Sequence, residues 1–165
     1  MKITEQTDAH TFEANGVKCL VKVIYPIVSS TRGSESINAF FSECKQKFID
    51  FAEKNALYDG EIFTLCICVK YCDDKILSVL FERKRKTGRA VRHGACLSAT
   101  ADLESGRLLP LLSLNGGLYG KTAQIRTQVR KCGIKVPFSA LKRQFFVTAE
   151  GITVYDGDKR CLLDI

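Results

Sequence analysis

The sequence predicts an α+β fold, in which a mostly antiparallel, curved sheet packs against one long helix and a shorter second helix. Several runs alternate apolar and polar residues with the period of a strand, and turn signals separate these runs. One segment instead repeats its apolar residues every three or four positions, as a helix does. At 165 residues and 45% hydrophobic, the chain can build one well-covered core but is short for two. We therefore interpret residues 1–165 as a single domain.

A hairpin and the long helix come first. Asn15-Gly16 separates the strand-like runs Thr11–Glu13 and Val17–Tyr25, and this dipeptide is a strong hairpin signal. Ser34 is a candidate helix N-cap, and the apolar residues after it predict an amphipathic helix of about five or six turns. Those residues are Ile37, Phe40, Phe41, Cys44, Phe48, Phe51 and Ala52. We interpret this stripe of phenylalanines as core rather than as a cofactor pocket.

A meander of strands follows the helix. Glu61–Tyr71 and Ile76–Arg85 each place apolar residues at alternate positions, which predicts an antiparallel pair with its apolar face under the helix. Thr87-Gly88 predicts a turn, and Gly94–Leu103 predicts the next strand. Gly106 then permits the positive φ that a tight turn requires.

The last third of the chain predicts a second helix and a closing hairpin. Lys121–Cys132 has a partly apolar side and is interpreted as the helix, and Pro137–Lys142 as a further helical turn. Phe145–Ala149 and Ile152–Tyr155 predict the hairpin, because a Glu-Gly pair separates them. A short strand is expected near Cys161–Leu163.

Charge and cysteine content narrow the class of protein. The formal net charge of +7 favours contact with an anionic surface, such as nucleic acid, a wall polymer or an acidic protein. The eight cysteines are irregularly spaced, which favours reduced buried thiols over a disulfide framework. No apolar run approaches the roughly 20 residues of a membrane helix, and no secretory signal begins the chain. We expect a cytoplasmic protein as the sequence stands, and an extracytoplasmic one if a leader has been removed.

The densest cluster of charge predicts a partner-binding surface. Its residues are Arg83, Lys84, Arg85, Lys86, Arg89 and Arg92. At the end of a hairpin they can contact phosphates or an acidic protein surface, and each such contact weakens with salt. The run lacks the interleaved aromatic residues that single-stranded nucleic acid favours. The alternative interpretation is a solvated hairpin end whose charges only protect an edge strand.

The strongest enzymatic pattern is the glycine loop Asn115–Thr122. Its end, Gly120-Lys121-Thr122, fits a phosphate-binding loop, but Asn115 stands where the opening glycine of that motif belongs. A nucleotide-binding sheet also needs repeated strand-helix alternation, and the upstream strands form a meander instead. A small nucleotide-binding enzyme is therefore the alternative function rather than the expected one.

Two other groups carry weaker patterns. Cys66, Cys68 and Cys72 are candidates for a soft metal site, but the two paired knuckles of a zinc site are missing. His93 and Cys96 stand three residues apart, which places them on opposite faces of a strand and argues against a catalytic dyad. We expect no catalytic residues, no metal and no cofactor.

The order of segments resembles that of a known family. VKVIYPIVSS, SINAFFSECKQKF, the strand pair, HGACLSATADLESGRLLPLLSL and FFVTAEGITVYD follow one another as in the extracytoplasmic domain of RsiV-type anti-sigma factors and PdaC-type peptidoglycan deacetylases. The likeness covers residues 17–160 and rests on Tyr25-Pro26, Ile37-Asn38, Asp102 to Gly106 and Phe146 to Tyr155. This chain differs in its cysteine content and in having no attached leader, membrane helix or deacetylase domain.

The resemblance implies a domain of unknown function with a curved antiparallel sheet, helices on one side and no catalytic residues of its own. It also implies a recognition or accessory role, with a lysozyme-like or wall-associated partner. The expected function is therefore a non-enzymatic domain that binds a protein or a cell-wall-related partner. A basic nucleic-acid-binding module is the second alternative, beside the nucleotide-binding enzyme.

Overall fold

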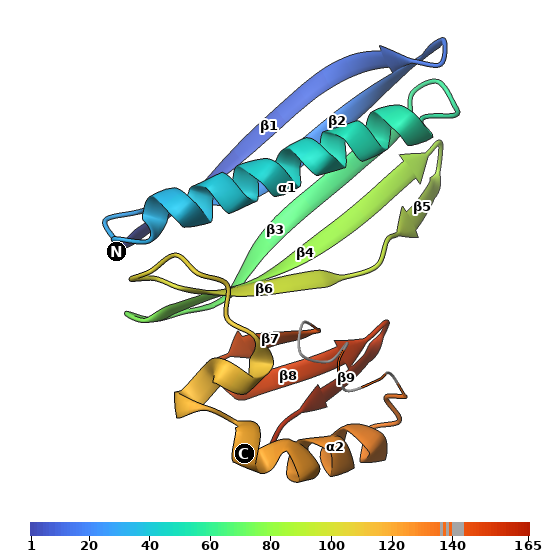
Figure 1. Ribbon diagram of the computed structural model, residues 1–165. Helices are drawn as coiled ribbons and strands as arrows, with labels where there is room; N and C mark the ends of the chain where they lie inside the picture. The colour runs from blue at the N-terminus through green and yellow to red at the C-terminus, as the bar shows by residue number, and fades with distance from the viewer. Residues whose placement is uncertain (136, 138, 140–143) are drawn as a thin grey trace. The chain divides into compact units, whose positions relative to one another are not determined.

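The computed structural model describes residues 1–165 with the exception of residues 136, 138 and 140–143. The helical turn predicted for Pro137–Lys142 lies outside the described residues. The elements in chain order are β1 (Lys2–Ala14), β2 (Val17–Ser29), α1 (Ser34–Asn55), β3 (Ile62–Cys72), β4 (Ile76–Thr87), β5 (Ala90–His93), β6 (Leu97–Asp102), the 3-10 helices η1 (Leu111–Gly116) and η2 (Tyr119–Lys121), α2 (Thr122–Lys131), β7 (Phe145–Thr148), β8 (Gly151–Asp156) and β9 (Lys159–Leu162). The α+β fold predicted from the sequence, with one long and one short helix, is confirmed (Figure 1).

Contacts divide the described chain into two compact units. Unit 1 comprises Met1–Cys68 and Phe81–Cys96, and unit 2 comprises Val69–Leu80 and Leu97–Ile165. The interpretation of the chain as a single domain stays a prediction. Within the described residues, no helix combines the length and the apolar character that crossing a membrane requires.

A long hairpin opens unit 1. β1 and β2 pair antiparallel from Lys2↔Ser29 to Ala14↔Val17. Between them Asn15 and Gly16 have φ values of 54° and 75°, as a two-residue type I′ turn requires. The predicted hairpin is confirmed, but its first strand begins at Lys2 rather than at Thr11. Most side chains of β1 are exposed, so polar residues occupy both of its faces and the alternation that marks a strand is lost.

One pair of neighbours in the first sheet is parallel. The strand order is β1-β2-β3-β4-β5, with β6 also paired to β4. The pairs β1–β2 and β4–β5 are antiparallel, whereas β2 and β3 run parallel from Leu20↔Ile62 to Ile24↔Cys66. A parallel pair needs a crossover connection, and α1 supplies it. The segment between α1 and β3 must therefore return the chain to the sheet, which gives it a structural role.

The long helix α1 packs on the sheet through its apolar stripe. Ile37, Phe41, Phe48 and Ala52 are buried, and the Phe40 ring meets the Phe81 ring edge-on with centroids 6.1 Å apart. Ser34 is not the N-cap that the sequence predicted: it is the first residue of the helix, Gly33 precedes it as the cap, and the Ser34 hydroxyl donates to the Thr31 carbonyl oxygen at 2.8 Å.

Asn38 joins α1 to β2. Its side-chain oxygen accepts from the Val28 amide at 2.9 Å, and its side-chain nitrogen donates to the Val28 carbonyl oxygen at 2.8 Å. One side chain thus satisfies both backbone groups of Val28, which pairs with β1 but lies beyond the stretch of β2 that pairs with β3.

The strand predicted at Gly94–Leu103 is shorter, β6 at Leu97–Asp102, and β5, which was not predicted, precedes it. β5 pairs with β4 across the two-residue turn Gly88-Arg89, and β6 begins only at Leu97. Gly94 follows β5 and donates its amide to the Arg83 carbonyl oxygen at 2.9 Å. A Cβ at Gly94 would lie 3.1 Å from the Arg83 Cβ, so glycine allows this close approach. The exposed, charged sequence of β5 gives no apolar alternation, which is why it was not predicted.

Unit 2 has its own small sheet and helix. β7, β8 and β9 form an antiparallel meander, and Ile125 and Val129 of α2 belong to the same buried cluster as Val154 of β8. The predicted closing hairpin is confirmed, with its turn at Ala149-Glu150 and Gly151 as the first residue of β8. The Ser78 hydroxyl is shared between the Thr100 hydroxyl and the Val147 amide, both at 2.9 Å, so a buried hydroxyl pair is fully bonded.

Candidate partner-binding site

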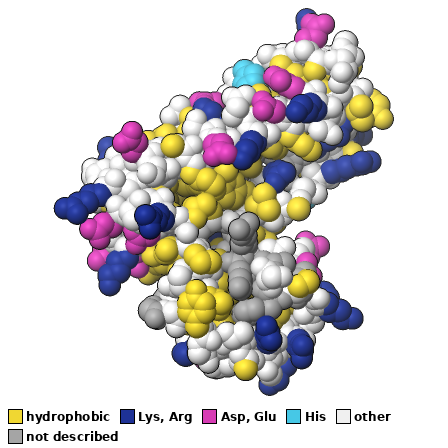
Figure 2. Space-filling model, viewed as in Figure 1, with side chains coloured by type: hydrophobic (Ala, Val, Ile, Leu, Met, Phe, Trp, Pro, Cys, Tyr) yellow, Lys and Arg dark blue, Asp and Glu magenta, His cyan; other side chains and the backbone are white. Residues whose placement is uncertain are grey.

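The predicted basic cluster borders a cavity in unit 1. The cavity has a volume of about 280 Å³ and is formed by α1, β3, β4, β5 and the two residues after β5. Its lining residues are Phe48, Phe51, Phe63, Arg83, Lys84, Arg85, Arg92, His93, Gly94 and Ala95. Figure 2 shows Lys and Arg side chains beside hydrophobic ones over β4 and β5, at the right of the view. The structure thus brings Arg83, Lys84, Arg85 and Arg92 to one place and leaves Lys86 and Arg89 outside the lining.

Strand register explains why Arg83, Arg85 and Arg92 lie together at the cavity. In the antiparallel pair of β4 and β5, Arg85 lies opposite Arg92 and Lys86 lies opposite Val91. Residues directly opposite each other share a face, and neighbours along a strand alternate between faces. Arg83, Arg85 and Arg92 therefore share one face, whereas Lys84, Lys86, Val91 and His93 belong to the other, although Lys84 and His93 also border the cavity. Arg89 lies in the turn, where it is exposed.

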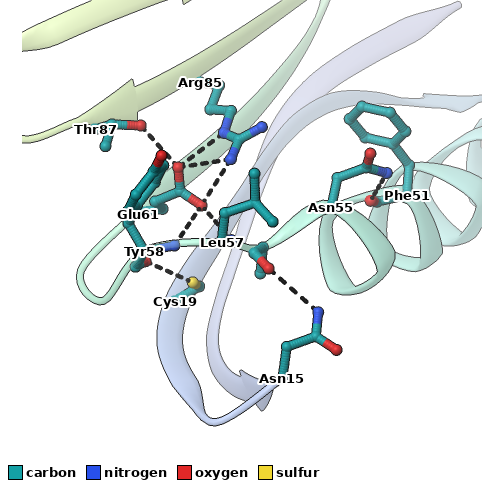
Figure 3. A network of polar contacts seen from close by, with 10 residues as sticks. Asn15, Cys19, Phe51, Asn55, Leu57, Tyr58, Glu61, Arg85 and Thr87 are labelled. Atoms are coloured by element: carbon teal, nitrogen blue, oxygen red, sulfur yellow. Dashed lines mark hydrogen bonds and ion pairs between the residues drawn. The ribbon is translucent and has the colours of Figure 1, made fainter.

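Beneath this face lies a buried carboxylate, Glu61, which the sequence did not single out (Figure 3). Its side chain is fully buried, with 0% exposed, and Arg85 donates to it from Nε at 2.9 Å and from Nη2 at 3.0 Å. Thr87 donates its hydroxyl to Glu61 Oε1 at 2.7 Å. The Leu57 and Tyr58 amides donate to Oε2 at 2.9 and 3.3 Å. Every lone-pair direction of the carboxylate is thus engaged by a donor.

These donors keep Glu61 ionised. Burial would raise the pKa of the carboxyl, but the hydrogen bonds from Leu57, Thr87, Arg85 and Tyr58 outweigh burial and lower the pKa to about 2. The negative charge is therefore present throughout the physiological range and is balanced by Arg85. Of the basic residues at the cavity, Arg85 thus has its charge engaged within the protein.

The same network holds the segment between α1 and β3. Asn15 donates to the Ala56 carbonyl oxygen at 3.2 Å, and the Cys19 thiol lies 3.5 Å from the Tyr58 carbonyl oxygen (Figure 3). Asp59 accepts from the Lys18 amide at 2.9 Å. The turn of the first hairpin and the start of β3 are thereby fixed to each other, and the backbone amides that bind Glu61 are held in place.

Aromatic rings form the apolar part of the cavity. The Arg85 guanidinium lies over the Phe63 ring, 5.2 Å from its centroid, and the Phe48 and Phe51 rings stack with centroids 6.3 Å apart. Phe51 is 44% exposed, which is unusual for a residue of the helix stripe that otherwise builds the core. An exposed ring next to cationic side chains offers a surface for an apolar group that carries a negative charge.

The charge at the cavity has one sign. No carboxylate is among its lining residues, and in the described part of the chain none forms an ion pair with Arg83, Lys84 or Arg92. The site combines an aromatic floor with uncompensated cations. It can therefore hold a ligand by burial of apolar surface and by charge, and its lining provides no nucleophile and base in contact.

The glycine loop has a different geometry from a phosphate-binding loop. The Leu118 amide donates to the Leu112 carbonyl oxygen at 2.7 Å, and the Lys121 amide donates to the Leu118 carbonyl oxygen at 3.0 Å. Thr122 donates its hydroxyl to the Tyr119 carbonyl oxygen at 2.8 Å. Two amides of the loop, and the hydroxyl that would hold the magnesium, are thus bonded to the chain itself.

The cysteine cluster is only partly assembled. The Cys66 and Cys68 sulfur atoms lie 3.1 Å apart on one face of β3, and burial raises the pKa of the Cys66 thiol to about 12. In the chain as described, no three His, Cys, Asp or Glu side chains come together as a metal site. His93 lines the cavity, whereas Cys96 is not part of its lining.

The comparisons with known proteins show what the chain is similar to. The sequence matches no family model, and no curated protein is similar to it in sequence. Among solved structures, a DUF3298 family protein from Pseudomonas aeruginosa is similar with a TM-score of 0.58 and 11% identity, over 96% of this chain and 84% of that one. The chain has the fold of DUF3298 proteins.

A second DUF3298 structure leads to the same result. This protein, from Bacteroides fragilis, has a TM-score of 0.54 and 14% identity, over 93% of this chain and 82% of its own. The neighbours come from a domain family of unknown function, which agrees with the kind of domain that the resemblance implied. At these identities the likeness concerns the fold alone, so any function must be argued from the site.

Proposed function

We propose that the protein is a non-enzymatic recognition domain that binds an acidic segment of a protein partner at the cavity of unit 1. The supporting observation is the joint presence of an aromatic floor, of which the Phe51 ring is exposed, and of cations without carboxylate partners. Arg85 is neutralised by Glu61, so the charges for binding come from Arg83, Lys84 and Arg92. A partner with carboxylates next to an apolar side chain matches both parts of the site.

The alternative functions have less support. The glycine loop uses its amides and the Thr122 hydroxyl internally, which disfavours nucleotide binding. Single-stranded nucleic acid needs a groove that follows the backbone, with a succession of stacking platforms, whereas the rings here line one compact cavity. A lysozyme-like or wall-associated partner is implied by the family resemblance alone, and the residues of the cavity do not identify it.

A peptide selection tests the proposal without knowledge of the partner. A random peptide library displayed on phage is selected on the wild-type protein and on the Arg83→Glu/Arg92→Glu variant. We expect the wild type to enrich peptides in which Asp or Glu flank an aromatic or aliphatic residue, and the variant to lose them. The binding of these peptides should weaken as salt rises, because the contacts lie at the surface.

The matched control reverses two charges elsewhere. Arg130→Glu/Lys131→Glu makes the same change in net charge on the exposed end of α2 in unit 2. It should retain the peptides, because α2 contributes nothing to the cavity. Selected peptides without an excess of Asp and Glu, or peptides that bind both variants equally, would overturn the proposed function.

A further inference from the structure

The edge strand beside the cavity has a specific arrangement of backbone groups. β5 is the last strand in the order β1-β2-β3-β4-β5, and all of its residues are exposed. The bond from the Gly94 amide to the Arg83 carbonyl oxygen makes Arg83 and Gly94 a hydrogen-bonded pair. Such pairs alternate along an antiparallel ladder. Arg85–Arg92 and Thr87–Ala90 are then also bonded pairs, and Val91 and His93 direct their N–H and C=O groups away from β4.

Outward N–H and C=O groups at an edge are a template for another strand. A strand that pairs with Val91 and His93 would run alongside β5, with alternate side chains on each face of the sheet. On the face of Arg83 and Arg92 these side chains would meet the cavity. Val91, in the middle of this edge, is 51% exposed.

Charge favours this edge over the opposite one. β1, at the other end of the strand order, carries Glu5, Asp8 and Glu13. β5 carries Arg92 and His93 and no carboxylate. Asp8 is paired with Lys45 at 2.8 Å, so Glu5 and Glu13 are the residues of β1 that would repel an acidic strand, whereas Arg92 would attract it to β5. The two edges of the sheet thus differ in the partner that each can accept.

We infer that the partner binds as an extended acidic strand added to β5, with an apolar side chain in the aromatic cavity and a carboxylate on each side of it. This inference rests on the proposed function and adds the mode of recognition, which is β-strand addition. It requires the carboxylates to stand two residues from the apolar residue, because only that spacing places all three on one face.

Two synthetic peptides of identical composition test the spacing. In Glu-Thr-Phe-Thr-Glu the carboxylates share a face with the ring, whereas in Thr-Glu-Phe-Glu-Thr they lie on the opposite face. Both peptides are acetylated and amidated, and binding is measured by isothermal titration at low salt. We expect the first to bind at least about tenfold more tightly, the effect of a difference of about 1.4 kcal/mol. Equal binding of the two would overturn strand addition but leave the proposed function standing, and binding of neither would overturn both.

A variant of the protein tests the backbone contact. Val91→Pro removes an N–H that faces away from β4, so the pairing of β4 and β5 retains its hydrogen bonds, and proline is tolerated in this position of an edge strand. We expect Val91→Pro to weaken binding of Glu-Thr-Phe-Thr-Glu about tenfold or more, whereas Val91→Thr should bind as the wild type does. Unchanged melting temperatures would show that both variants fold. If Val91→Pro fails to fold, the wild-type protein is tested instead with Glu-Thr-Phe-Thr-Glu that is N-methylated at both threonines. Binding as tight as that of the unmodified peptide to the wild type, by Val91→Pro or by the methylated peptide, would refute the inference.

Discussion

The ion pair of Glu61 and Arg85 leads to a quantitative prediction. Glu61→Gln keeps the shape of the side chain but removes the charge that balances Arg85, whose side chain is 27% exposed. Loss of one partner of a fully buried pair costs about 3–5 kcal/mol, and partial exposure of the guanidinium reduces the cost. We expect Glu61→Gln to lower the free energy of unfolding by about 2–3 kcal/mol at pH 7.

The pH dependence of stability provides an independent measure. The carboxyl titrates at about 2 in the folded protein against an ordinary pKa of 4.5. A group whose pKa is lowered by folding stabilises the protein above its unfolded pKa, and that contribution is lost as pH falls through the folded pKa. The difference corresponds to about 3 kcal/mol, present above pH 4.5 and lost between about pH 4.5 and pH 2.

Urea unfolding of wild type and Glu61→Gln at several pH values between 2 and 7 measures both effects. Other carboxyls titrate in the same window, so the difference between the two proteins isolates Glu61. This difference should be largest at pH 7 and should shrink as the pH falls below about 4.5. A constant difference across that range, or no difference at pH 7, would refute the assigned role of Glu61.

Three further predictions concern other contacts. Asn38→Ala leaves both backbone groups of Val28 without their partner and should cost about 1–3 kcal/mol in urea unfolding; a loss within error would contradict the role of Asn38. Gly94→Ala places a Cβ 3.1 Å from the Arg83 Cβ, so it should lower the free energy of unfolding by about 1 kcal/mol and weaken binding of Glu-Thr-Phe-Thr-Glu at the cavity. Unchanged stability and unchanged peptide affinity would contradict the close approach of Gly94 to Arg83. Cys132 is exposed, whereas Cys19 is buried and burial raises the pKa of its thiol, so iodoacetamide should label Cys132 at least about tenfold faster than Cys19 in the native protein. Mass spectrometry of the labelled peptides measures both rates, and equal rates would contradict the prediction.

Much of the fold could be predicted because its signals are local. The Asn15-Gly16 turn, the apolar stripe of α1 and the hairpin of β7 and β8 each depend on residues close in sequence. β1 and β5 lie at sheet edges and expose most of their side chains. Their sequences therefore lack the apolar alternation by which a strand is identified.

The site was predictable in part. The run of basic residues located the β4–β5 hairpin, but the choice of lining residues depends on the strand register, which separates Arg85 from Lys86. Glu61 stood at the start of a predicted strand and carried no pattern of its own. Its partner Arg85 is 24 residues away, and only the fold brings the two together. The aromatic floor was interpreted as core, and only the exposure of Phe51 distinguishes it.

The parallel pairing of β2 and β3 also affects how the protein can be synthesised. The β1–β2 hairpin joins segments that are adjacent in sequence, but Leu20 can meet Ile62 only after the whole of α1 has been translated. During that interval one edge of β2 stays open, at the stage when nascent chains are most prone to associate with each other. Folding of this region should therefore be slower than its hairpin suggests, since distant segments must meet first.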